Sequence, residues 1–306
     1  MSQPSQRAFR PPLTSEQAEG LARSSGLREM GIRPPLVRYL PAVWMRRSFV
    51  WNLSKSRAYT RNQGSYLGQA WSVINPTLDA AVYIIVFGFV FGARKGIENI
   101  AAFITVGTFT YALFQRAVMA GVDAIPMNLD LVRSHQFPRA VVPAATSLTE
   151  AVLFAPALVV MVIISYLTGF LPGMGTVDPR WTWLLLPVAA VLLVIFSMGT
   201  SFFLARIGAR TPDLRNVLPF FLSLGRYGSG VMFSIQSMVN PHAWWAKVLE
   251  WQPISVYLTL FRACFGNEPS ARLSPQLWYW AVGWALIVLI PGFIFFWGAE
   301  KTYGRD

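Results

Sequence analysis

The sequence is poor in charge, and most of the charges it has are basic. Only 13% of its 306 residues are charged and 54% are hydrophobic, with 26 Lys and Arg against 14 Asp and Glu. A soluble domain carries about a quarter charged residues. The shortage of charge, together with several long apolar runs, excludes an ordinary soluble domain and predicts an all-α membrane protein.

Cysteine and histidine are almost absent as well. The single Cys264 excludes a disulfide within the chain, and the two histidines, His135 and His242, leave no cluster that resembles a metal site. The phosphate-binding pattern G-x-x-x-x-G-K-[ST] does not occur. We therefore expect no metal and no cofactor in this chain, and we expect ATP and magnesium, if used, to bind a separate subunit.

The chain divides into a polar tail and an apolar remainder. Residues 1–35 contain Pro and Ser without apolar periodicity, which predicts a disordered cytoplasmic tail. No apolar signal-peptide segment occurs near the start, so we expect the N-terminus to stay in the cytoplasm. Residues 36–306 are predicted to be the transmembrane domain. Its six predicted spans are 69–92, 100–122, 141–170, 181–207, 217–235 and 277–297.

Two further segments are apolar without being spans. Residues 36–55 mix apolar and basic side chains, among them Trp44, Arg46 and Arg47, which predicts an amphipathic helix in the membrane interface. An ordinary solvated helix is the alternative. Residues 236–276 are too long and too apolar for a simple loop, which predicts short re-entrant or interfacial helices before the last span.

Two polar stretches interrupt the apolar runs. LVRSHQFPRAVVP at 131–143 and GARTPDLRN at 208–216 are too polar for hydrocarbon. The segments assigned to the cytoplasm hold eighteen Lys and Arg and the outer segments six, a strong positive-inside bias that also places the C-terminus inside. Topology and anionic lipid head groups explain the net charge of +12 better than nucleic acid does. These stretches offer a docking surface for a motor subunit, unless their charges only set the topology; its candidate residues are Arg133, His135, Pro138, Arg139, Asp213 and Arg215.

Charged and aromatic side chains also occur inside the spans. Arg116 and Arg226 either meet a lipid pyrophosphate, which arginine binds in a bidentate manner, or pair with Asp79 or Glu150 and fix the packing. Sugar C–H faces stack on aromatic rings, so aromatic side chains in the first two spans are candidates for the lining of a glycan tunnel, with core or lipid-facing packing as the alternative. They are Tyr83, Phe87, Phe91, Tyr111 and Phe114.

Three pieces of the sequence resemble one family. YTRNQGSYLGQAWSVINPTLDAAVYIIVFGFVFG, LVRSHQFPRAVVPAATSLTEAVLF and TPDLRNVLPFFLSLGRYGSGVMFS, in this order, are similar to permease subunits of type-2 ABC exporters of polysaccharides. The resemblance implies a homodimer of six-span subunits docked to two ATP-binding cassette subunits. It also implies a bacterial plasma-membrane location and a polyprenyl-pyrophosphate-linked glycan as cargo.

The identity of the cargo and two rival functions stay open at this point. Only four of the basic residues are lysines, a bias typical of a GC-rich genome, and we favour a cell-wall galactan over O-antigen or teichoic acid. One rival is a type-2 ABC permease for a drug or a simple lipid. The other is a membrane enzyme acting on lipid-linked sugars, which needs clustered carboxylates, whereas no D-x-D pair occurs here.

Overall fold

The computed structural model describes residues 14, 20–21, 24–25, 35–61, 63–90, 97–134, 137–235, 244–266 and 272–303. The chain forms two units, Met1–Pro34 and Pro35–Asp306. In the first unit the Ser25 amide donates a 3.0 Å hydrogen bond to the Leu21 carbonyl. The predicted disorder of residues 1–35 falls almost entirely outside the described residues, so it stays a prediction.

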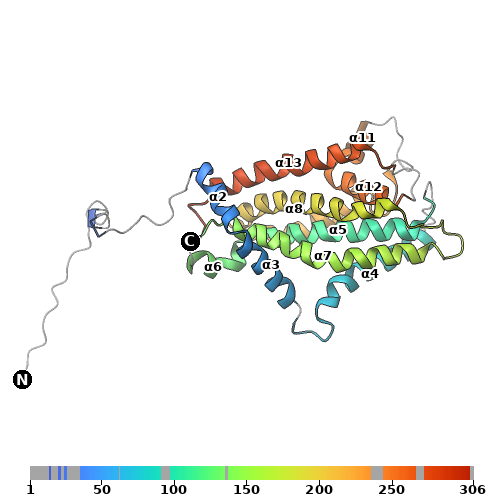
Figure 1. Cartoon of the computed structure of the whole chain (residues 1–306), viewed down its shortest axis with the longest axis horizontal. Coiled ribbons are helices and arrows are strands. Elements are labelled where there is room, and N and C mark those ends of the chain that lie inside the picture. The colour runs from blue at the N-terminus through green and yellow to red at the C-terminus, as the bar shows by residue number, and fades with distance from the viewer. Residues whose placement is uncertain are drawn as a thin grey trace, which may run out of the picture. The chain divides into compact units, whose positions relative to one another are not determined.

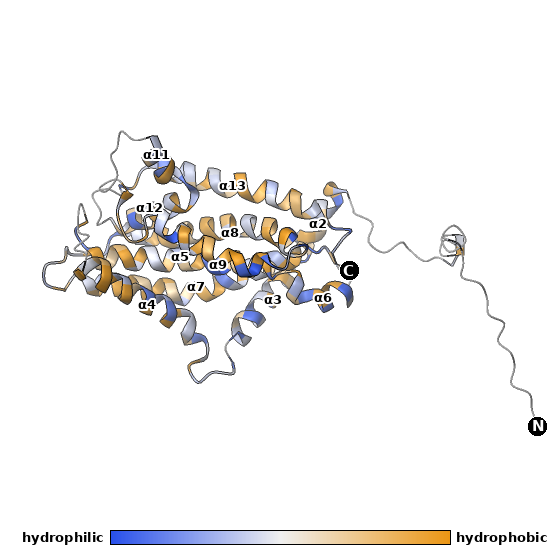
Figure 2. Ribbon diagram, turned by 180° about the vertical axis from the view of Figure 1, so that it is seen from behind, coloured by the Kyte–Doolittle hydropathy of each residue, from blue (hydrophilic) through white to orange (hydrophobic). Residues whose placement is uncertain are grey.

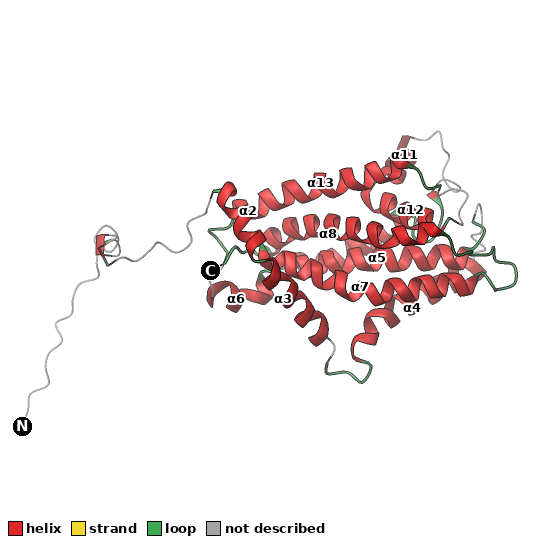
Figure 3. Ribbon diagram, in the orientation of Figure 1, coloured by secondary structure: helices red, strands yellow, loops and turns green. Residues whose placement is uncertain are grey.

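Helices make up most of the described part of the second unit, and no strand occurs among the described residues (Figure 3). The predicted all-α fold is therefore confirmed. Short 3-10 turns at Gly68–Ala70, Pro126–Asn128 and Trp181–Leu185 lead into helices, and a π-helical segment, Ile84–Val90, continues α4. The α-helices are α2 (Leu36–Met45), α3 (Arg47–Thr60), α4 (Trp71–Tyr83), α5 (Ile100–Val122), α6 (Leu129–Ser134), α7 (Val141–Thr168), α8 (Leu186–Gly208), α9 (Leu214–Gly228), α11 (Trp244–Trp251), α12 (Pro253–Phe265) and α13 (Pro275–Gly298).

The long helices α4, α5, α7, α8 and α13 run side by side (Figure 1). α5 is the most buried of them, because α4, α7, α8 and α12 all pack against it. We call the end of the bundle that holds α2 and α6 the α2 end, and the end that holds α11 and α12 the α12 end (Figure 1). These names are used below for position along the bundle.

Small residues bring the bundle helices close together. α8 and α13 touch at Gly199 and Gly292, where a Cβ on Gly292 would lie 2.4 Å from the Gly199 carbonyl oxygen. Between α7, α8 and α5, the Ser147 hydroxyl donates to Ser201 and the Ser201 hydroxyl donates to the Ala117 carbonyl, both over 2.9 Å. Membrane helices associate through such close backbone approach and interhelical hydrogen bonds.

The predicted spans agree with the structure in part. Four helical stretches are long and apolar enough to cross a membrane, at Gly68–Val90, Val141–Thr168, Trp181–Gly208 and Pro275–Gly298. α5 has the predicted bounds but is not among these four. The helix predicted at 217–235 differs from the structure in its bounds, because α9 begins at Leu214 and ends at Gly228, and Gly230 adopts a left-handed φ of 77° that stops the helix. The expected number of six spans therefore stays a prediction.

The predicted amphipathic segment is two helices, not one. α2 and α3 are separated at Arg46 and extend to Thr60. Tyr39, Ser54 and Ala58 are buried against the bundle, whereas the opposite side exposes large apolar side chains such as Trp44, 71% exposed. Basic residues interrupt these apolar positions (Figure 2), and Arg46 and Arg47 are exposed. This mixture suits a helix that lies in a membrane interface.

The predicted short helices before the last span exist as α11 and α12. Ten of the thirteen α12 residues are buried, so this helix is part of the bundle core, with its backbone shielded by protein. Cys264 is 0% exposed there. The membrane depth of both helices stays a prediction.

Candidate functional site

A polar cavity of about 620 Å³ lies between α3, α4, α5 and α7. It opens on the half of the bundle nearer the α2 end, beside the C-terminal half of α5. Seven charged residues line it, and we call it the polar cavity: Arg57, Arg61, Asp79, Arg116, Asp123, Glu150 and Arg226.

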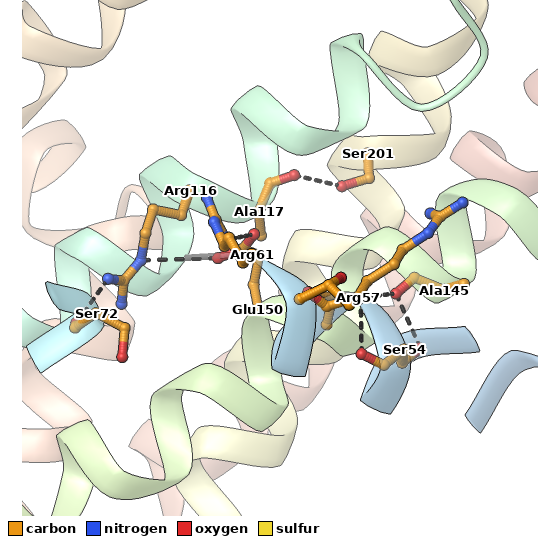
Figure 4. Close-up of polar contacts among 11 residues, drawn as sticks. Ser54, Arg57, Arg61, Ser72, Arg116, Ala117, Ala145, Glu150 and Ser201 are labelled. Atoms are coloured by element: carbon orange, nitrogen blue, oxygen red, sulfur yellow. Dashed lines mark hydrogen bonds and ion pairs between the residues drawn. The ribbon is translucent and has the colours of Figure 1, made fainter. Parts of the chain in front are cut away.

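Glu150 on α7 is the central acid of the cavity (Figure 4). Its carboxylate accepts a hydrogen bond from Arg61 on α3 and lies 3.7 Å from the Nε of Arg116 on α5. The Arg116 Nη1 also donates 2.9 Å to the Ser72 carbonyl at the start of α4. The Glu150 side chain is only 3% exposed, so its charge requires these two cations. Three segments of the chain therefore meet at this carboxylate, and Arg116 connects a fourth, the start of α4, to it.

Arg226 enters the cavity from α9. Its Nη1 donates 2.6 Å to the Tyr83 hydroxyl and lies 3.8 Å from the Asp79 carboxylate, and its Nη2 donates to the Gln115 side chain. The guanidinium carbon also lies 5.4 Å from the centre of the Tyr111 ring, within the range of a cation–π contact. Arg226 thus connects α9 to α4 and α5.

The arginines retain capacity to bind an anion. The Nε and Nη2 atoms of Arg116 and the Nε of Arg226 are buried donors with no hydrogen-bond partner among the residues that the structure describes. Arg57 bonds the Asn128 side chain, and burial lowers the pKa of its guanidinium, although an arginine remains charged. Planar guanidinium groups with spare donors match the oxygens of phosphate or carboxylate. The cavity can therefore hold a phosphate-like group.

The fit of α3 against α7 places Arg57 and Arg61 in the cavity. The Ser54 hydroxyl donates 3.0 Å to the Ala145 carbonyl of α7, and the small Ala58 is 3% exposed one turn later. Arg57 and Arg61 follow at a spacing of four, so they share a face of α3. Sequence reasoning counted both only as topology charges. Their spacing of four next to a small-residue stripe was the signal that could have found them.

The coupling residues predicted at 131–143 differ in their exposure and in their contacts. Arg133 on α6 is exposed, Pro138 is half-buried, and His135 lies outside the described residues. Arg139 is engaged within the chain: its backbone amide donates 2.9 Å to Glu300 Oε1, and its guanidinium donates to the Glu300 carbonyl. Arg139 is therefore committed to an internal contact that the sequence did not predict.

Glu300 joins three segments at the α2 end. Besides Arg139, it accepts a 2.8 Å hydrogen bond from the Tyr39 hydroxyl of α2, and the Ala140 amide donates 3.1 Å to the Tyr39 oxygen. We call Tyr39, Arg139 and Glu300 the clasp. Burial raises the pKa of the Glu300 carboxyl, and the hydrogen bonds from Arg139 and Tyr39 oppose that rise. The clasp ties α2 and the residues after α13 to the predicted coupling stretch.

On the second polar stretch, Asp213 and Arg215 lie at the start of α9 and are exposed. Arg215 pairs within the chain, with its Nε 3.5 Å from the Asp123 carboxylate. An exposed pair of this kind contributes little to stability. Breaking this contact would therefore cost little free energy.

The predicted tunnel aromatics divide into two groups. Tyr83 and Phe87 on α4 are half-buried with ring centres 6.5 Å apart, while Phe91 lies outside the described residues. Tyr111 is 2% exposed in the core, and Phe114 stacks on Phe196 with centres 5.7 Å apart. Tyr111 is enclosed by neighbouring side chains in this structure, so its place in the lining of a tunnel stays a prediction.

The open question on Arg116 and Arg226 is partly answered by their partners. Each is paired with an acid, Arg116 with Glu150 and Arg226 with Asp79, as the packing interpretation predicts. Both residues nevertheless line the cavity, so the two interpretations are compatible.

Comparison with known proteins gives consistent matches. A model of the ABC-2 type transporter family matches residues 50–265. The O-antigen export system permease protein RfbA of Myxococcus xanthus is 26% identical over 252 residues, 82% of this chain and 93% of that protein. RfbA of Klebsiella pneumoniae is 25% identical over 207 residues, 68% of this chain and 76% of that protein. The polysialic acid transport protein KpsM of Escherichia coli is 22% identical over 197 residues, 64% and 72% of the two chains.

Proposed function

The chain belongs to the ABC-2 type transporter family, and from this premise we propose that it is the membrane permease of an ATP-driven polysaccharide exporter. Permeases of this family work with an ATPase that is a separate subunit, so this chain is a transport subunit and not an enzyme. Relatives named for O-antigen export and polysialic acid transport support a polysaccharide cargo over a drug or a simple lipid.

The observation that carries the proposal further is the polar cavity. A polyprenyl-pyrophosphate carrier has one strongly anionic group between a lipid tail and a glycan. Arg116 and Arg226 line a cavity of about 620 Å³ next to the basic helix α3, and each has at least one buried donor without a hydrogen-bond partner among the described residues. Those donors suit the pyrophosphate, and the exposed apolar side of α2 suits the lipid surface from which the carrier enters.

We place the α2 end at the cytoplasmic face of a bacterial plasma membrane, with both termini inside. The excess of basic residues in the segments at this end supports that orientation. Two ATP-binding cassette subunits would then dock on the exposed residues near Arg133 and Asp213, with ATP and magnesium bound on the docked subunits.

A second copy of the chain is the proposed partner within the membrane. Asp79 on α4 is 52% exposed, an expensive position for a carboxylate that faces lipid. α9 exposes large apolar side chains next to it, including Phe220 at 67% and Phe221 at 57%. A homodimer seam with a hydrated path beside Asp79 accounts for both features. A cell-wall galactan remains the cargo we favour.

The test reconstitutes the chain with its cassette ATPase in liposomes. Polyprenyl-pyrophosphate-linked galactan, O-antigen and teichoic acid precursors are supplied in turn, and ATP hydrolysis and glycan translocation are measured. We expect one of the glycans to stimulate hydrolysis and to cross the bilayer. Arg116→Ala should lower translocation without reducing co-purification of the cassette subunit, whereas Arg272→Ala, at an exposed position beyond α12, should leave translocation unchanged.

Two results would contradict the proposal. Normal translocation by Arg116→Ala would remove Arg116 from the pyrophosphate site. Stimulation by a simple lipid or a drug, without a response to any linked glycan, would replace the polysaccharide with another cargo.

A further inference from the structure

The C-terminal end of α9 is buried and its backbone carbonyls need partners. α9 ends at Gly228, and the chain turns at Gly230 with its left-handed φ of 77°. Ser229 is 2% exposed and Val231 is 0% exposed. The last carbonyls of a helix have no partner within the helix, and burying them unpaired is costly.

Side chains from one other segment satisfy four consecutive carbonyls. Gln252 Nε2, at the residue before α12, donates 2.8 Å to the Gly228 carbonyl, and the Ser255 hydroxyl donates 2.9 Å to that of Ser229. Arg262 then donates 3.0 Å to the Gly230 carbonyl and 2.9 Å to that of Val231. We call Gln252, Ser255 and Arg262 the carbonyl clamp.

Arg262 also anchors the clamp to the central helix. Its Nη2 lies 3.3 Å from the Phe103 carbonyl of α5, and its guanidinium carbon lies 3.3 Å from the centre of the Phe103 ring. Gly107 makes room for it, because a Cβ there would lie 2.7 Å from the Arg262 Nη2. Arg262 is one of the six basic residues assigned to the outer segments, and it is 7% exposed, so its charge is packed inside the bundle; the side of the membrane on which it lies stays a prediction.

Apart from the clamp and the contacts of Arg226, α9 packs sparsely against the bundle. Leu222 is its one buried residue, and the Leu222 carbonyl accepts a hydrogen bond from Tyr111. Arg226 lies two residues before Gly228, the first carbonyl of the clamp. Any shift of the α9 end would therefore move Arg226 relative to Tyr83 and Asp79.

We propose that Gln252, Ser255 and Arg262 are positioning residues that hold Arg226 in the polar cavity and so set the affinity for the diphosphate group of the carrier. This inference rests on the proposed function. The clamp residues do not touch the cavity; they act through the α9 backbone. Binding of the diphosphate in the polar cavity, in the half of the bundle nearer the α2 end, would thereby depend on how the clamp residues pack at the α12 end.

The experiment is a double-mutant cycle on the complete chain in lipid nanodiscs. The dissociation constant of radiolabelled polyprenyl diphosphate is measured for Gln252→Leu/Ser255→Ala and for Arg262→Lys, each with Arg226 present and with Arg226→Met. We expect the clamp variants to weaken binding about tenfold when Arg226 is present and by no more than about twofold when it is absent, because coupled residues are not additive. If Arg262→Lys does not fold, the milder Gln252→Leu/Ser255→Ala variant decides.

Matched controls change the same residue types elsewhere. Ser223→Ala on α9, Gln276→Leu on α13 and Arg272→Lys are at exposed positions outside the clamp and should leave binding unchanged. If the clamp variants weaken diphosphate binding equally with Arg226 present and with Arg226→Met, or do not weaken it in either case, the positioning role of the clamp is contradicted. If Arg116→Met and Arg226→Met themselves leave binding unchanged, the diphosphate site is wrong and the clamp proposal fails with it. If those two weaken binding but the clamp variants do not, only the clamp is wrong.

Discussion

Tyr39 and Glu300 are 261 residues apart in the chain, yet the Tyr39 hydroxyl donates a 2.8 Å hydrogen bond to the Glu300 carboxylate. Removing that hydroxyl in Tyr39→Phe also removes the acceptor of the Ala140 amide. Two buried polar groups lose a partner, so we expect a loss of about 1 to 3 kcal/mol in the free energy of unfolding. Thermal unfolding in detergent measures it. Tyr59→Phe, at a side chain 66% exposed, is the control, and an equal loss there would contradict the role of the clasp.

The clasp should also make stability depend on pH. Burial raises the pKa of the Glu300 carboxyl above its ordinary value, so the folded state keeps this proton to a higher pH than the unfolded state does. The contribution of Glu300 to stability is therefore complete below the ordinary pKa of a glutamate. It is lost as the pH rises through the raised value.

Glu300→Gln tests this dependence, because glutamine keeps an acceptor for Tyr39 and for the Arg139 amide but cannot titrate. The stability difference between Glu300→Gln and the native chain, measured by denaturation from about pH 4 to 8, should shift in favour of Glu300→Gln as the pH rises. A difference that is constant with pH would show that Glu300 does not titrate with a raised pKa.

The contact between α8 and α13 should tolerate no side chain at Gly292. A Cβ there would lie 2.4 Å from the Gly199 carbonyl oxygen, whereas a Cβ at Gly283 on the same helix meets nothing within 4 Å. We expect Gly292→Val to cost about 1 to 3 kcal/mol or to prevent folding, because an overpacked contact forces the backbones apart. Gly283→Val has the same helix propensity change without the clash. Similar thermal stabilities for the two variants would refute the contact.

Variants of the Arg116–Glu150 ion pair can distinguish a role in stability from a role in transport. Glu150→Leu alone leaves Arg116 without its acid and should destabilise the chain by about 3 to 5 kcal/mol. The double variant Arg116→Met/Glu150→Leu replaces both charges by apolar groups and should recover most of that loss. Translocation should remain low in the double variant, since the anion-binding guanidinium is gone. Recovery of translocation together with stability would assign Arg116 to packing alone.

The two arginines of the predicted coupling stretch should behave differently under charge reversal. Arg133→Glu changes an exposed side chain and should mainly weaken co-purification of the cassette subunit. Arg139→Glu places a second carboxylate next to Glu300 and should lower thermal stability as well. If the cassette subunit binds Arg133→Glu and hydrolyses ATP normally, the coupling assignment is wrong.

The sequence predicted local features of the fold well. The bounds of α5 agree residue for residue with the predicted second span, because a Gly- and charge-containing loop precedes it and a polar stretch follows it. The acidic partner of Arg116 was one of two predicted candidates. The end of α9 was missed because Val231, Met232 and Phe233 continue the apolar run after the helix has stopped.

Contacts that depend on the tertiary arrangement could not be predicted. No local sequence pattern predicts the clasp around Glu300. None predicts that the clamp residues donate hydrogen bonds to four carbonyls at and after the end of α9. In both cases the partners are far apart in the chain, so only the packing of whole helices brings them together. Arg262 shows the limit most clearly, because a charge beside a loop and a charge buried in the bundle look alike in one sequence.

The burial of α5 has a consequence for biosynthesis. This helix occupies the centre of the bundle, yet it is missing from the set of helices that are apolar enough to cross a membrane by composition. An arginine opposes membrane insertion of its helix, by about 3 kcal/mol at the helix centre and by less toward the ends. Arg116 lies in the C-terminal third of α5 and finds its acid only on α7, a later segment. α5 should therefore enter the bilayer stably only after α7 has been made, so fragments that stop before α7 should leave it uninserted.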